Sequence, residues 1–138
     1  MFKVTSIVRM KEEKPLAWNV IFKVDHSVME YATDIVYAAK RNIWVANSFI
    51  THDLSSLMAV KRCAFCMEDK IACGVLSREH QEVMDSMVTN EEFLEKLNSI
   101  LPHVNDLPET VTIEARKPVW DEILYENFTH KLLLKKRD

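Results

Sequence analysis

The sequence predicts an α+β fold in which helices pack against an antiparallel β-sheet. Two runs near the N-terminus alternate apolar and polar residues, which is the repeat of a β-strand. Residues 27–41 and 77–101 instead carry apolar residues three or four apart, which is the repeat of a helix. The predicted order is ββαβ, then a hairpin, a helical segment and a further strand. Helices packed on antiparallel hairpins of this kind describe an α+β fold.

The first two strands are predicted to form a hairpin. In FKVTSIVRM, residues 2–10, strict alternation places on one face Phe2, Val4, Val8 and Met10. In LAWNVIFKV, residues 16–24, one face is entirely apolar and comprises Leu16, Trp18, Val20, Phe22 and Val24. A polar connection, KEEKP, joins the two runs, so we expect them to pair as antiparallel strands.

A helix is predicted over residues 27–41. Ser27 and Glu30 have the spacing of a capping box. The apolar residues that follow at helical spacing are Val28, Tyr31, Ala32, Ile35, Val36 and Ala39. Lys40 and Arg41 suit the negative end of the helix dipole, so the predicted helix ends there.

The strand predicted at residues 43–50 places Trp44 and Ile50 on one face and Val45 on the other. If the helix at 27–41 covers the face of Val45, Trp44 and Ile50 lie on the opposite side of the sheet. Either the segment 77–101 or a partner chain must then cover them. Trp44 and Ile50 are therefore candidate partner-binding residues, and burial within the chain is the alternative.

The remaining elements follow from periodicity and capping signals. Residues 77–101 are predicted to form one bent helix or two consecutive helices, with Thr89 and Glu92 as an internal capping box and Pro102 as the stop. Residues 110–116 alternate like a strand. The tail from Lys117 fits two structures equally, a helix led by Pro118 or a strand followed by a frayed end, and residues 130–138 are expected to form a frayed basic tail. We expect residues 1–138 to form a single domain.

All three cysteines lie in RCAFCMEDKIAC, residues 62–73, and raise the alternatives of a metal site and a core of thiols. The candidate zinc ligands are His52, Cys63, Cys66, Cys73 and His80, but the set lacks a second tight pair beside the C-x2-C of Cys63 and Cys66. A helix over residues 54–67 would place Cys63 and Cys66 on one face, where both could bind a metal. The favoured hairpin, residues 57–66 and 71–77 turning at MEDK, would place Cys66 and Cys73 on one face and leave Cys63 alone. We therefore expect buried thiols that act as small apolar groups, and no cofactor. Zinc is the alternative.

Composition excludes several classes of function. The only glycine is Gly74, so neither a GxGxxG loop nor a P-loop can be written. No nucleophile elbow or deaminase motif occurs, which argues against an enzyme; a small enzyme using a cysteine or histidine in a groove between sheet and helices is an alternative. The net charge of −3 argues against a nucleic-acid-binding protein, and no stretch suits a membrane span or signal peptide. Free cysteines in such a chain suggest the cytoplasm.

The charge is concentrated in residues 77–109, which contain eight acids and the two cations Arg78 and Lys96, a net −6. Such a segment attracts a basic surface and accelerates association with it. We therefore expect a small non-enzymatic regulatory or adaptor protein that binds another protein, and that inhibits a nucleic-acid-handling partner through this segment. The candidate residues are Glu79, Glu82, Glu91, Glu92 and Glu95. The alternatives are a homodimer interface and a zinc-stabilised nucleic-acid module that uses Cys63 and Cys66.

Overall fold

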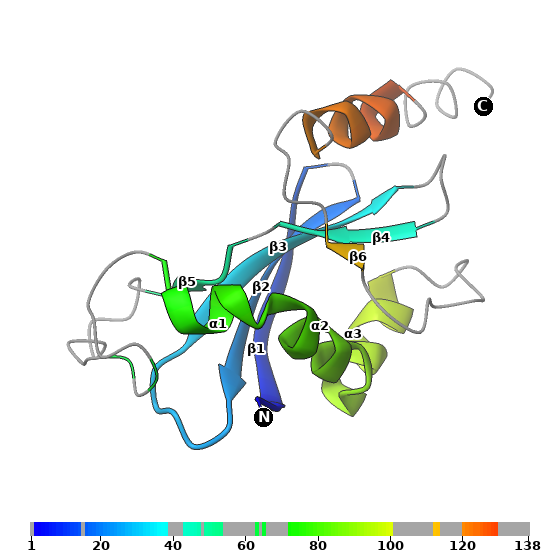
Figure 1. Cartoon of the computed structure of the whole chain (residues 1–138). Helices are drawn as coiled ribbons and strands as arrows, with labels where there is room; N and C mark the ends of the chain where they lie inside the picture. The colour runs from blue at the N-terminus through cyan, green and yellow to red at the C-terminus, as the bar shows by residue number, and fades with distance from the viewer. Residues whose placement is uncertain are drawn as a thin grey trace.

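A β-sheet of six strands forms the centre of the molecule (Figure 1). The computed structural model describes residues 2–14, 16–38, 43–47, 49–53, 63, 65, 72–100, 112–113 and 120–129. The strands are β1 (Val4–Lys14), β2 (Ala17–Val24), β3 (Tyr31–Ala38), β4 (Ile43–Ala46), β5 (Thr51–His52) and β6 (Thr112–Ile113). Their order is β1-β2-β3-β4-β6, with β5 paired to β3. All pairs are antiparallel except β4 with β6.

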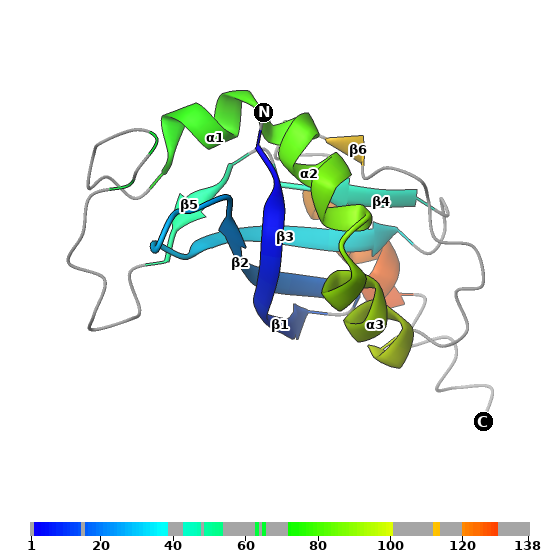
Figure 2. The ribbon, with the colours of Figure 1, turned by 90° about the horizontal axis from the view of Figure 1, so that it is seen from below.

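Helices cover both faces of this sheet (Figures 1 and 2). The helices α1 (Gly74–Arg78), α2 (His80–Val88) and α3 (Glu91–Ile100) follow one another across one face. A helix over residues 120–129 lies against the opposite face. The α+β class with an antiparallel sheet, the N-terminal hairpin and consecutive helices within 77–101 are thus confirmed. The tail is helical over 120–129, as the first of its two alternatives predicts.

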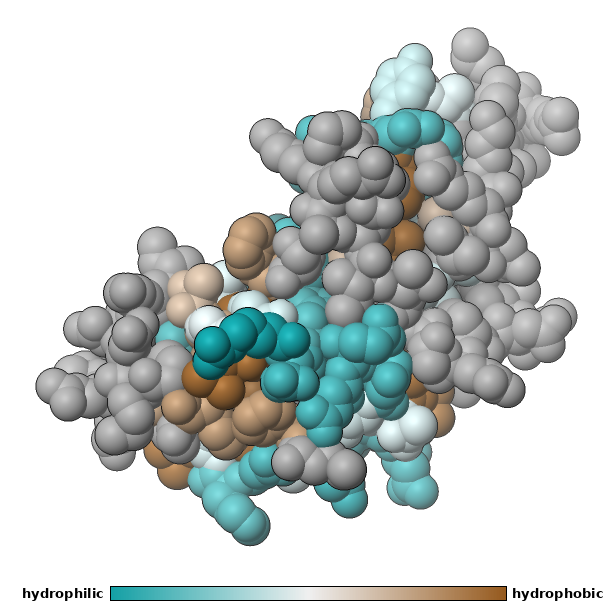
Figure 3. All heavy atoms as spheres, in the orientation of Figure 1, coloured by the Kyte–Doolittle hydropathy of each residue, from teal (hydrophilic) through white to brown (hydrophobic). Residues whose placement is uncertain are grey.

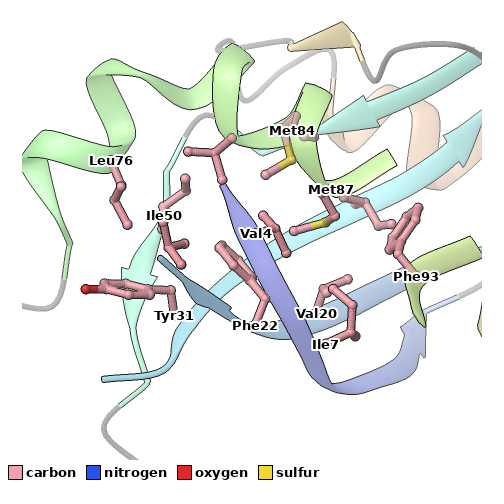
Figure 4. Close-up of a cluster of buried hydrophobic side chains, with 14 of the residues drawn as sticks. Val4, Ile7, Val20, Phe22, Tyr31, Ile50, Leu76, Met84, Met87 and Phe93 are labelled. Atoms are coloured by element: carbon pink, nitrogen blue, oxygen red, sulfur yellow. The ribbon is translucent and has the colours of Figure 1, made fainter. Parts of the chain in front are cut away.

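The larger hydrophobic core lies between the sheet and α1–α3 (Figure 4). Alternate residues of β2 supply it with Trp18, Val20, Phe22 and Val24, as the period of the sequence predicts. The helices contribute Leu76, Val83, Met84, Met87, Phe93 and Leu97. A smaller core on the other face contains Ala17, Val36, Ala38, Val45 and Ile123. The sheet is therefore buried on both sides along much of β3 and β4.

The predicted helix over 27–41 is wrong, because residues 31–38 form the central strand β3. Tyr31 and Ile35 face the larger core, while Val36 and Ala38 face the smaller one. A strand buried on both faces loses its polar alternation, so its apolar residues also satisfy a helical template. The Ser27 hydroxyl caps no helix: it hydrogen-bonds the Tyr31 hydroxyl at 3.0 Å and accepts from the Met29 N–H at 3.3 Å.

The hairpin predicted from residues 57–66 and 71–77 is wrong at its C-terminal end, where α1 begins at Gly74. Ala72 still forms a β-bridge with Thr51 before the chain turns into the helix. The predicted turn at MEDK lies outside the described residues.

The β1 strand departs from strict alternation. Register shifts occur between Val4 and Ser6 and between Ile7 and Arg9. Val4 and Ile7 consequently both face the core, while Val8, which the alternation assigns to the apolar face, is exposed.

Candidate functional site

The candidate residues lie in two parts of the structure: the outer surface of α2 and α3, and a buried cluster of sulfur and imidazole groups. We call the first the acidic helical surface and define it by Glu79, Glu82, Glu91, Glu92 and Glu95. We call the second the thiol–imidazole cluster and define it by His52, Cys63 and Cys73.

The acidic helical surface contains two kinds of carboxylate. Glu79, Glu91 and Glu95 are exposed, and within the described residues none of their carboxylates forms a hydrogen bond or an ion pair. Glu82 and Glu92 instead accept hydrogen bonds from backbone N–H groups of the N-terminal segment. Figure 3 shows hydrophilic side chains over the outward surface of α1 and α2. Of these five carboxylates, only those of Glu79, Glu91 and Glu95 therefore lack a hydrogen-bond or ion-pair partner within the described residues.

Glu82 and Glu92 belong to a set of helix side chains that cover the outer edge of β1. An edge strand carries unpaired backbone groups that would otherwise attract another strand. Here three N–H groups donate to helix side chains: Phe2 to Glu82 at 3.3 Å, Val4 to Ser86 at 2.8 Å and Ile7 to Glu92 at 2.9 Å. Glu82 and Glu92 thus have a structural role that the charge pattern alone did not reveal.

Trp44 and Ile50 are buried inside the chain, with 2% and 0% of their surface exposed. Both belong to the larger core beneath α1–α3, and the Trp44 ring packs at 5.7 Å from that of Trp18. Of the two alternatives for this face of the sheet, coverage by the segment 77–101 accounts for their burial.

The thiol–imidazole cluster joins three segments that are distant in sequence. His52 lies on β5, Cys73 immediately precedes α1, and Cys63 lies between them in the chain. The Sγ atoms of Cys63 and Cys73 are 3.8 Å apart, and the three ligating atoms lie within 4.8 Å of one another. All three residues are buried.

This arrangement corrects the predicted pairing of the thiols. The hairpin register left Cys63 alone and placed Cys73 with Cys66, whereas Cys63 and Cys73 are in contact. Cys73 has an extended backbone (φ −87°, ψ 105°) and immediately precedes α1, which begins at Gly74. Cys66 lies outside the described residues. Cys63 and Cys73 are buried, a property that core thiols and buried metal ligands share.

Hydrogen bonds surround the sulfur of Cys63. The Tyr31 hydroxyl lies 3.0 Å from it, and the Phe65 N–H donates to it at 3.4 Å. Burial, and then the hydrogen bond with Cys63, raise the pKa of the Tyr31 hydroxyl far above its ordinary value, so this group stays protonated and available as a donor. Sequence reasoning missed Tyr31, because its position in a predicted helix concealed its place beside the cysteines.

His80 lies apart from this cluster, at the start of α2. It is 3% exposed, and neither ring nitrogen has a hydrogen-bond partner of normal geometry among the described residues. Burial lowers the pKa of the ring, and the nearby Asn47 backbone opposes this shift in part. Of the five predicted zinc ligands, the structure thus brings together His52, Cys63 and Cys73.

Two surface pockets could in principle serve as the groove of a small enzyme. One lies beside helix 120–129 and includes Trp18, Asn19, Asp34 and Trp120; the other lies between β1 and the α2–α3 junction. Neither pocket is lined by a cysteine or a histidine. These pockets therefore supply no thiol or imidazole nucleophile.

No family model, curated protein or solved structure matches this chain. Within the described ranges, no helix has both the length and the apolar character needed to cross a membrane.

Proposed function

We propose that this protein is a non-enzymatic regulatory or adaptor protein that binds a basic region of another protein through its acidic helical surface. One observation carries the proposal: Glu79, Glu91 and Glu95 are exposed and, in the part of the chain that the structure describes, have no cationic partner. Carboxylates without a partner within the chain remain available to a cation on a second molecule.

The charge of the described helical segment supports this proposal. Residues 72–100 contain six acids and two cations, Arg78 and Lys96, so the segment carries −4. A surface dominated by one sign of charge steers an oppositely charged partner toward it and raises the association rate. Such steering weakens as salt shortens the reach of the field.

The structure also narrows the set of residues to test. Glu82 and Glu92 hold the N-terminal strand by hydrogen bonds, so replacing them would disturb the fold as well as the charge. Glu79, Glu91 and Glu95 make no such contacts among the described residues. They are the carboxylates whose neutralisation isolates the electrostatic contribution.

The test compares two variants of equal charge. The variant E79Q/E91Q/E95Q neutralises the acidic helical surface, and the control E12Q/E13Q/D121N removes three exposed carboxylates elsewhere. Both raise the net charge from −3 to 0. The wild-type chain first captures its partner from nuclease-treated host lysate, and association rates with that purified partner are then measured at low and high salt.

We expect the helical variant to associate roughly tenfold more slowly at low salt and to lose most of its salt dependence. The control variant should associate like the wild type. Equal rates for all three proteins would contradict the proposal.

A further inference from the structure

Backbone and side-chain hydrogen bonds connect the segments that carry His52 and Cys73. The Cys73 N–H donates to the Ile50 carbonyl at 2.9 Å, and Ser77 Oγ contacts both the N–H and the carbonyl of Ile50. His52 pairs with Tyr31 across β5 and β3. These bonds fix the segments that carry His52 and Cys73 before any ligand arrives, which is the preorganisation that a binding site requires.

The spacing of the sulfur atoms matches a tetrahedral metal centre. Zinc binds thiolate sulfur at about 2.3 Å, so two sulfurs at the tetrahedral angle lie about 3.8 Å apart. The Sγ atoms of Cys63 and Cys73 are separated by 3.8 Å. A disulfide would need a separation of about 2.05 Å, so the two sulfurs are not covalently joined. The imidazole of His52 lies within the same 4.8 Å limit as both sulfurs.

The groups around Cys63 suit a thiolate. A thiolate is a pure hydrogen-bond acceptor, and Cys63 Sγ has the Tyr31 hydroxyl and the Phe65 N–H beside it. Donors of this kind orient a metal-bound sulfur and stabilise its charge. A thiol that only packs in an apolar core does not require two hydrogen-bond donors beside its sulfur.

We propose that His52, Cys63 and Cys73 bind a zinc ion that pins β5 and the start of α1 together. Each thiol releases its proton to solvent as it binds, and His52 donates a lone pair from a neutral ring nitrogen. Two thiolates balance the charge of Zn²⁺, so the complete centre is neutral, as a buried site requires. The described residues supply three ligands, and the fourth position of the tetrahedron is open to water or another donor.

The test measures the metal bound to the full chain, purified under reducing conditions without chelator. We expect about one zinc per chain, and Co²⁺ in its place should give the intense absorption of sulfur-to-cobalt charge transfer. The variants C63S and C73S should each bind zinc more than about 100-fold more weakly. The control is H80Q, because His80 is equally buried but lies outside the cluster, and it should keep the metal.

Three results would overturn the proposal. One is less than about 0.1 zinc per wild-type chain both as purified and after titration of the reduced protein with Zn²⁺. Another is full retention of zinc by the double variant C63S/C73S, which would place the metal elsewhere. The third is a Co²⁺ spectrum of the wild type without thiolate absorption, and this measurement does not depend on the variants folding.

Discussion

At the scale of single residues, His80 is a buried base without a hydrogen-bond partner of normal geometry among the described residues. Burial lowers the pKa of its ring in the folded protein. An unfolded histidine has a pKa of about 6.5, so below that pH the unfolded chain binds a proton that the folded chain does not. The stability contributed by the neutral ring is therefore present above this pH and is lost as the pH falls toward the lower folded value.

Replacing His80 with Leu should remove this acid sensitivity. We expect the free energy of unfolding of H80L to fall less between pH 7.5 and pH 5.5 than that of the wild type, because leucine binds no proton in either state. The measurement is urea unfolding at both pH values. His26 is exposed, so H26Q serves as the control and should keep the wild-type pH dependence. An unchanged slope in H80L would show that other groups cause it.

Asn90 shows how a single side chain connects an element to its neighbour. Its Oδ1 accepts from the Phe93 N–H at 3.1 Å and so caps the start of α3, while its Nδ2 donates to the Val4 carbonyl at 3.3 Å. Both contacts fall where α2 ends and α3 begins, beside the edge of β1. The sequence predicts this cap one residue earlier, at Thr89.

At the scale of elements, the start of α3 therefore depends on Asn90. We expect N90A to lower the free energy of unfolding by about 1–2 kcal/mol, because the cap and the bond to Val4 are lost together. N90S keeps a capping oxygen and loses only the donor, so it should be closer to the wild type, roughly 1 kcal/mol below it. Urea unfolding measures both, and equal destabilisation by the two variants would exclude the capping role.

A comparison of β2 with β3 shows which strands a sequence pattern can predict. β2 was predictable because its two faces differ: Trp18, Val20 and Phe22 face the core, while Asn19 and Lys23 do not. β3 was not predictable, because Val36 and Ala38 on its second face are buried too, and its apolar residues also fit the repeat of a helix. Its identity follows from its neighbours in the sheet, which is tertiary information.

The candidate functional residues, too, were predictable from the sequence only in part. The acidic residues were evident from composition, whereas the binding of Glu82 and Glu92 to β1 depends on contacts between residues 80 or more positions apart. The residue types of the thiol–imidazole cluster were evident too. Which of them meet depends on contacts between His52, Cys63 and Cys73, which lie on segments distant in sequence, and local spacing does not encode such contacts.

At the scale of the whole molecule, two cores of unequal size share one sheet. The larger core includes twenty buried residues from the sheet, α1–α3 and the segments around them, and the smaller includes five from the sheet and helix 120–129. Ile123 is the one described residue of that helix that is a fully buried member of the smaller core. Asn127 adds a hydrogen bond from its Nδ2 to the Tyr37 carbonyl at 2.9 Å. Regions with few buried contacts open at lower free energy than the rest of a protein.

A charge at Ile123 should therefore release helix 120–129 without unfolding the sheet. In I123D a carboxylate would lose its hydration on docking, so we expect the amides of residues 120–129 to lose protection from hydrogen exchange. The amides of β2 and β3 should keep theirs, because the larger core holds them from the other face. Y125D places the same group at an exposed position of that helix and should leave exchange unchanged. Loss of protection throughout the sheet in I123D would instead mean that the two cores unfold as one unit.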